Sequence, residues 1–102
     1  MLKITIGHDS DSHTVVQLEG ELSTTTVESF NEEVSKFELK EGSLITLDFN
    51  NLEFISSAGL RGLLLLQKNS APAGVKVEIA GMKPDIRQIF DISGFTEIFG
   101  LE

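Results

Sequence analysis

Residues 44–66 read LITLDFNNLEFISSAGLRGLLLL, and this stretch decides the fold. It begins with a dense apolar run at 44–49, typical of a central strand that is buried on both faces. The polar residues 50–57 predict a short loop, and the leucine-rich segment 59–67 predicts a helix with a broad apolar face. A buried strand followed at once by a helix is the repeating unit of an α/β fold.

The segments on either side extend this pattern. Alternating apolar residues at 2–6 and β-branched residues at 14–18 predict two strands, joined by a polar hairpin loop at 7–13. Residues 75–79 alternate again and predict a further strand, while a short apolar stretch at 98–99 suggests a last one.

Two more helices are predicted from spacing and end signals. Apolar residues recur at steps of three and four from Val27 to Phe37, and the segment Thr25-Thr26-Val27-Glu28 matches a capping box that places the helix start near residue 25. Lys83-Pro84-Asp85 opens the other helix, which Gly94 ends.

The predicted element order is β-β-α-β-α-β-α. Strands that alternate with helices favour an α/β layer with parallel pairs, and the initial hairpin adds an antiparallel pair. The expected fold is therefore a mixed four- to five-stranded sheet packed by three or more helices. With 102 residues, a hydrophobic fraction of 40% and no linker or repeat, one domain over residues 1–102 is expected.

Composition argues against several functions. The chain has no cysteine, which excludes disulfides, thiolate metal sites and cysteine nucleophiles. Its net charge is −8 and its 8 basic residues are scattered, so binding to nucleic acid or to an anionic membrane surface is not expected. The N-terminus lacks the apolar segment of a signal peptide, and the longest apolar run, 63–66, is far too short for membrane insertion. We expect a cytoplasmic protein.

The first hairpin gathers His8, Asp9, Asp11 and His13, residue types that ligate zinc or manganese. A solvated loop tip explains the same residues through local turns, and ligands on such a loop need rigid support. We therefore expect no metal and no other cofactor.

Ser57 lies at a strand-to-helix turn, where α/β hydrolases carry a nucleophilic serine. Such a serine needs flanking glycines on both sides and a histidine base. Ile55 does not supply the first glycine, and both histidines lie far away in the sequence. An enzyme is therefore not expected.

Ser56 and Ser57 have two physical interpretations. Either hydroxyl can cap the second helix by accepting a hydrogen bond from the free amides of its first turn, and capping alone explains both serines. The same place suits a phosphorylation switch, because a helix N-terminus favours a phosphate. A protein that docks on this helix end would then meet the added charge.

Three segments resemble the STAS domain family, the anti-sigma factor antagonists. Residues 54–61, FISSAGLR, follow a strand that contains an aspartate and resemble the family signature. Residues 18–22, LEGEL, resemble the segment before the first helix, and Lys83-Pro84 with residues 89–95 resembles the last helix and its turn. The match spans nearly the whole chain in order and spacing.

This resemblance implies a small α/β module that binds an anti-sigma factor and thereby frees a sigma factor for transcription. In typical members the anti-sigma factor is also an ATP-dependent serine kinase, and a serine phosphatase removes its phosphate. The acceptor, two positions before the motif glycine, is Ser57 here, with Ser56 as the alternative. Ser56 and Ser23 stand where typical members often carry aspartate.

The partner surface is expected where the strand-to-helix loops meet, since these helix starts emerge beyond the same edge of the strands. Arg61 and Leu60 are expected to be partly exposed there, with a core position as the alternative for Leu60. The candidate partner-binding residues are Ser23, Thr24, Thr25, Ser56, Ser57, Ala58, Gly59, Leu60 and Arg61. Two other functions stay open: an accessory STAS subunit of a membrane transport system and a small serine hydrolase.

Overall fold

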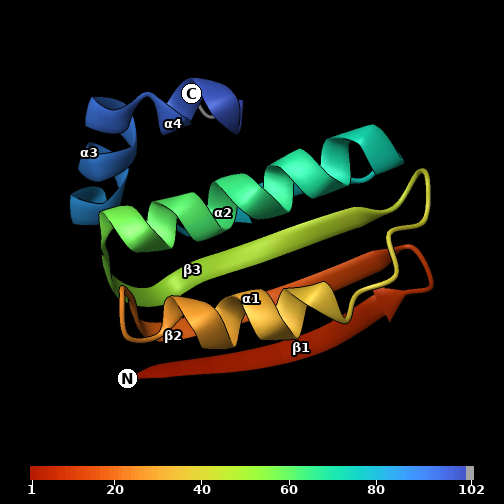
Figure 1. Cartoon of the computed structure of the whole chain (residues 1–102), viewed down its shortest axis with the longest axis horizontal. Helices are drawn as coiled ribbons and strands as arrows, with labels where there is room; N and C mark the ends of the chain where they lie inside the picture. Colours follow the sequence, from red (N-terminus) through yellow and green to blue (C-terminus); the bar gives the residue numbers. More distant parts are fainter. Residues whose placement is uncertain (101–102) are drawn as a thin grey trace.

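A computed structural model describes residues 1–100 and shows a mixed four-stranded sheet (Figure 1). The first two strands pair antiparallel, and the other neighbours pair parallel. This arrangement confirms the predicted sheet. The strands lie in the order β1 (Leu2–Ser10), β2 (His13–Leu22), β3 (Leu44–Ile55) and β4 (Lys76–Ala80).

Two helices, α1 (Val27–Ser35) and α2 (Ser57–Ser70), lie side by side over one face of the sheet (Figure 1). A short 3₁₀ turn, Ala71–Ala73, follows α2 and leads through a left-handed Gly74 into β4. The third helix, α3 (Pro84–Ser93), lies beyond the start of α2. The element order confirms the predicted β-β-α-β-α-β-α.

The end of the described chain is helical, so the suggestion of a last strand at 98–99 is wrong. Gly94 ends α3 in the left-handed conformation, as predicted, and α4 (Phe95–Ile98) follows at once. Phe95 and Phe99 are one helical turn apart, and both rings lie against Phe90, with centroid distances of 6.0 and 6.2 Å. The Phe95 and Phe99 rings also contact each other, with centroids 6.2 Å apart. This packing selects a helical turn, because residues four apart lie about 13 Å apart in a strand but only one turn apart in a helix.

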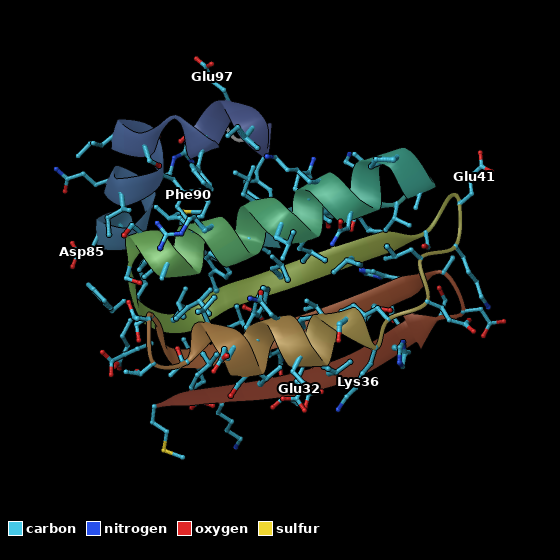
Figure 2. The ribbon with its side chains drawn as sticks, viewed as in Figure 1. Glu32, Lys36, Glu41, Asp85, Phe90 and Glu97 are labelled. Atoms are coloured by element: carbon cyan, nitrogen blue, oxygen red, sulfur yellow. The ribbon has the colours of Figure 1, made fainter. Side chains whose placement is uncertain are left out.

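The hydrophobic core lies between the sheet and the helices. Phe90 of α3 packs edge-on against Phe49 of β3 with ring centroids 6.1 Å apart, and Figure 2 shows Phe90 directed inward while Glu97 points away from the molecule. The largest fully buried side chains come from every layer: Phe30, Phe49, Phe90, Leu18, Leu22, Leu47, Leu52, Ile55, Leu63, Ile86 and Val16.

β3 is longer than its apolar run suggested, and the loop predicted at 50–57 is mostly strand. The strand continues to Ile55, paired with β2 through two register shifts, each of which leaves one extra residue on β3. Because of these bulges the buried residues Phe49, Leu52 and Ile55 are spaced by three instead of two. The polar residues between them face solvent without ending the strand.

The first hairpin is also tighter than predicted. β1 extends to Ser10 and β2 starts at His13, so the turn is only residues 11–12. The polar side chains at 8–10 are compatible with a strand because that part of β1 is exposed. Among residues 1–100 no helix is long and apolar enough to cross a membrane.

Candidate functional site

The starts of α1 and α2 meet at one end of the sheet. The Ser56 amide donates to the Leu22 carbonyl across 3.0 Å, which ties the start of α2 to the last residue of β2. A Cβ on Gly59 would lie 2.4 Å from the same carbonyl oxygen, so only glycine allows this approach. The structure therefore places the two groups of candidate partner-binding residues, 23–25 and 56–61, next to each other.

Ser56 is the N-cap of α2. Its backbone is extended, with φ −98° and ψ 174°, and its hydroxyl accepts a hydrogen bond from the Gly59 amide at 3.3 Å. The Ser56 carbonyl accepts the first helical hydrogen bond, from the Leu60 amide at 2.9 Å. The Ser56 hydroxyl is half-buried and already hydrogen-bonded, so its role is to cap the helix.

Ser57 is the first residue of α2, and its side chain is exposed. Within residues 1–100 its hydroxyl makes no hydrogen bond, in contrast to the Ser56 hydroxyl. The first amides of a helix lack intrahelical partners and carry the positive end of its dipole. The Ser57 hydroxyl is thus accessible, unbonded and placed where a negative group is favoured.

The hydroxyls before α1 are arranged differently, and the capping box predicted at 25–28 does not form. The helix begins at Val27, two residues later than predicted, and Thr26 makes no side-chain cap. The Thr26 hydroxyl instead accepts from the Ser23 amide at 2.9 Å and donates to the Glu21 carbonyl at 2.8 Å. These two hydrogen bonds stabilise the turn that follows β2. Because they occupy the Thr26 hydroxyl, it does not cap the helix.

Thr24 and Thr25 are exposed at this turn. The Thr25 hydroxyl lies 3.2 Å from that of Ser23, which is half-buried. All three residues are therefore near the surface beside the start of α2.

The expectation that Leu60 is partly exposed is wrong. Its side chain is 7% exposed and belongs to the core, as do Leu63 and Leu66 on the same helix. Leu60 and Leu63 are three residues apart, so they lie on one face of α2, the face that the sheet covers. Arg61, one residue later, is exposed as expected.

Phe54, three residues before Ser57, is an exposed aromatic residue that the sequence patterns did not predict. Its side chain is 46% exposed, and it pairs in register with Glu21 at the end of β2. The bulge at this position turns Phe54 outward while Leu52 and Ile55 stay buried. Only the register shift reveals this exposure, because a regular alternation in the sequence does not predict it.

The charged groups nearby include the N-terminus. The Met1 ammonium group lies 3.3 Å from Glu21 Oε1, and both groups are largely exposed, so this ion pair contributes little to stability. Elsewhere in the molecule, the Thr96 hydroxyl of α4 and then the Arg87 guanidinium of α3 hold the pKa of the exposed Asp91 carboxyl below its ordinary value.

The hairpin histidines lie at the opposite end of the sheet from Ser57. His13 pairs in register with Leu44, the first residue of β3, whereas Ser57 follows the last. His13 Nδ1 lies 3.2 Å from Asp9 Oδ2, and its Nε2 lies 2.8 Å from the Thr46 hydroxyl. In the part of the chain that is described, no three His, Cys, Asp or Glu side chains form a group that could hold a metal ion.

Two hollows in the surface lie away from the candidate site. One, of about 370 Å³, is lined by the first hairpin and the segment before β3. The other, of about 280 Å³, lies between α1 and the second half of α2. Neither of these two hollows is lined by residues 23–25 or 56–61.

A family model and a curated relative both match this chain. Residues 6–102 match the STAS domain. A Bordetella bronchiseptica protein, provisionally named anti-sigma factor antagonist BtrV, is 33% identical over 87% of this chain and 77% of its own length.

Solved structures share the fold at lower identity. The Bacillus cell fate determinant SpoIIAA in its phosphorylated form has a TM-score of 0.70 and 24% identity, over 93% of this chain and 86% of that one. A sulfate transporter family protein from Wolinella succinogenes has a TM-score of 0.76 and 14% identity, over 88% of this chain and 73% of that one. At these identities the likeness establishes the fold.

Proposed function

The chain belongs to the STAS domain family, and we propose that it is an anti-sigma factor antagonist that phosphorylation of Ser57 switches off. In its unmodified form it binds an anti-sigma factor and thereby releases a sigma factor. The anti-sigma factor is also the serine kinase that modifies Ser57, and a serine phosphatase restores the active form. The provisional name of the Bordetella relative supports this assignment.

The observation that carries the proposal is the contrast between two adjacent serines. The Ser56 hydroxyl caps α2, whereas the Ser57 hydroxyl is exposed and makes no hydrogen bond among the described residues. A kinase can reach Ser57 without breaking any interaction of the fold. Phosphorylation there adds roughly −1.5 to −2 charges beside amides and a dipole that favour them, so the domain stays folded.

The partner meets the phosphate on a surface that several exposed residues share. Thr24 and Thr25 lie on the α1 side of this surface, Arg61 on the α2 side, and Phe54 at the end of β3. Aromatic residues and arginine are both enriched at the centres of protein interfaces. A phosphate buried unpaired in such a contact costs several kcal/mol, which is enough to release the partner.

This role is binding and requires no catalysis by the chain itself. The two histidines that a serine nucleophile would need lie at the far end of the sheet, beyond reach of Ser57. The proposed partners are proteins of the transcription machinery, so the proposal places the chain in the cytoplasm.

The test combines phosphorylation with binding. Incubation with the anti-sigma factor kinase of the same genome and ATP is expected to add one phosphate, which peptide mapping places on Ser57. Ser57→Ala should abolish the transfer and keep the complex with the anti-sigma factor. Ser57→Asp should weaken that complex by a large factor, because it introduces an anion at the contact.

Ser56→Ala is the matched control, since it removes the neighbouring hydroxyl and should leave phosphorylation of Ser57 in place. Transfer to Ser56 instead, or an anti-sigma complex of Ser57→Asp as tight as that of the unchanged protein, would contradict the proposed switch.

A further inference from the structure

Arg61 lies one helical turn after Ser57 and has no acidic neighbour on its helix. The α2 sequence SAGLRGLLLLQKNS contains no acidic residue. The positions three and four residues away from Arg61 are occupied by Ser57, Ala58, Leu64 and Leu65. Its side chain is exposed, and within residues 1–100 it makes no ion pair, whereas Arg87 pairs with Asp91 at 3.2 Å.

The geometry of a helix directs Arg61 toward Ser57. Residues four apart lie on the same face with Cβ atoms about 5–6 Å apart. Helical side chains lean toward the N-terminus, so the long side chain of Arg61 can reach the turn that holds Ser57. An anion four residues before a cation is the favourable order for a helical ion pair.

We propose that Arg61 forms an intramolecular ion pair with the phosphate on Ser57. This inference rests on the proposed phosphorylation of Ser57 and adds a second element to the switch. A guanidinium offers a planar fork of donors that matches a phosphate, and the helix supplies no competing carboxylate.

Phosphorylation would then change the docking surface in two ways at once. It adds negative charge at Ser57, and it engages the Arg61 guanidinium, which is then no longer available to a partner. The contact loses a cation and gains an anion, which makes the change larger than that caused by the phosphate alone.

The experiment places phosphoserine at position 57 by codon reassignment, so that no kinase is needed. The phosphate is titrated by ³¹P NMR in the otherwise unchanged protein, in Arg61→Gln and in Lys68→Gln. Lys68 is the matched control, since it is an exposed base of the same helix about 16 Å along the axis from Ser57. The ¹H–¹⁵N spectrum of each variant verifies the fold.

The titration midpoint of the phosphate is expected to lie about 0.3 pH units lower with Arg61 present than in Arg61→Gln. In Lys68→Gln the phosphate should titrate as in the protein that keeps both Arg61 and Lys68. Added salt should reduce the difference in midpoint between the proteins with and without Arg61. Equal midpoints with and without Arg61 overturn the ion pair. This result is independent of the proposed function, because a kinase that ignores Ser57 leaves the titration unaffected.

Discussion

The two helix starts at the end of the sheet use their hydroxyl groups in different ways. Before α1, the Thr26 hydroxyl is bonded to Ser23 and Glu21, and the Ser23 and Thr25 hydroxyls lie against each other. Before α2, Ser56 alone serves as the cap, and the Ser57 hydroxyl has no partner among the described residues. Both starts are rich in Ser and Thr, so residue type does not show which hydroxyl caps a helix.

The difference comes from how the chain enters each helix. Ser56 is extended and leads directly from β3 into α2, which directs its hydroxyl at the first turn of the helix. Thr26 has helical dihedral angles, φ −118° and ψ −13°, and its hydroxyl turns back toward β2. A cap needs an extended backbone at the residue before the helix, and of these two starts the one before α2 provides it.

Replacement of Gly59 by alanine should produce the largest effect, because it separates the two starts. The new Cβ would lie 2.4 Å from the Leu22 carbonyl oxygen, a backbone atom that cannot turn away. We expect a loss of about 1–3 kcal/mol in the free energy of unfolding, despite the better helix propensity of alanine.

Gly62→Ala is the matched control for this variant. Its Cβ would lie 2.7 Å from the Val27 Cγ2 methyl group, which belongs to a side chain and can shift, so the loss should be smaller. Thermal and urea unfolding measure both. A Gly59→Ala protein as stable as Gly62→Ala would contradict the close contact between α2 and the end of β2.

Sequence patterns predicted the fold well because each element carries its own local signal. The alternation in residues 2–6 and the three-four spacing from Val27 depend on short-range geometry alone. The strand residues 50–55 lacked such a signal, because two bulges replace the period of two by a period of three. A bulge is a property of the pairing with β2, which local sequence does not encode.

The candidate site was predicted less completely for a similar reason. The position of Ser57 at the first turn of α2 follows from the sequence, but which of two serines caps the helix depends on the backbone at Ser56. The burial of Leu60 and the exposure of Phe54 depend on which face the sheet covers. Both properties depend on tertiary packing, and a single sequence does not show which face of a helix or strand the rest of the molecule covers.

Ser56→Ala should cost about 1 kcal/mol of stability, since it removes the cap of α2. Thr25→Ala at the start of α1 is the control and should change stability by less than about 0.5 kcal/mol, because Thr25 is exposed and does not cap. Urea unfolding measures both variants. Equal losses of stability in Ser56→Ala and Thr25→Ala would contradict the capping role that distinguishes Ser56 from the hydroxyls before α1.

Ser57→Asp should raise stability slightly, by about 0.3–1 kcal/mol, because it places an anion at the positive end of α2. Ser57→Asn is the neutral control and should lack this gain, and the difference should shrink in high salt. Thermal unfolding at two salt concentrations measures it. A destabilised Ser57→Asp protein would show that the first turn of α2 does not accept negative charge, and the proposed phosphate site would lose its physical basis.

Arg61→Ala should have the smallest effect on stability, within about 0.5 kcal/mol, because the side chain is exposed and has no ion pair among residues 1–100. Its effect should appear in binding, since Arg61 lies beside the Ser57 surface that we assign to the partner. Lys68→Ala, near the other end of α2, should leave both quantities unchanged. Calorimetric titration with the anti-sigma factor and thermal unfolding of the same samples separate the two effects. A large loss of stability with intact binding would make Arg61 a structural residue and move the partner surface away from the start of α2.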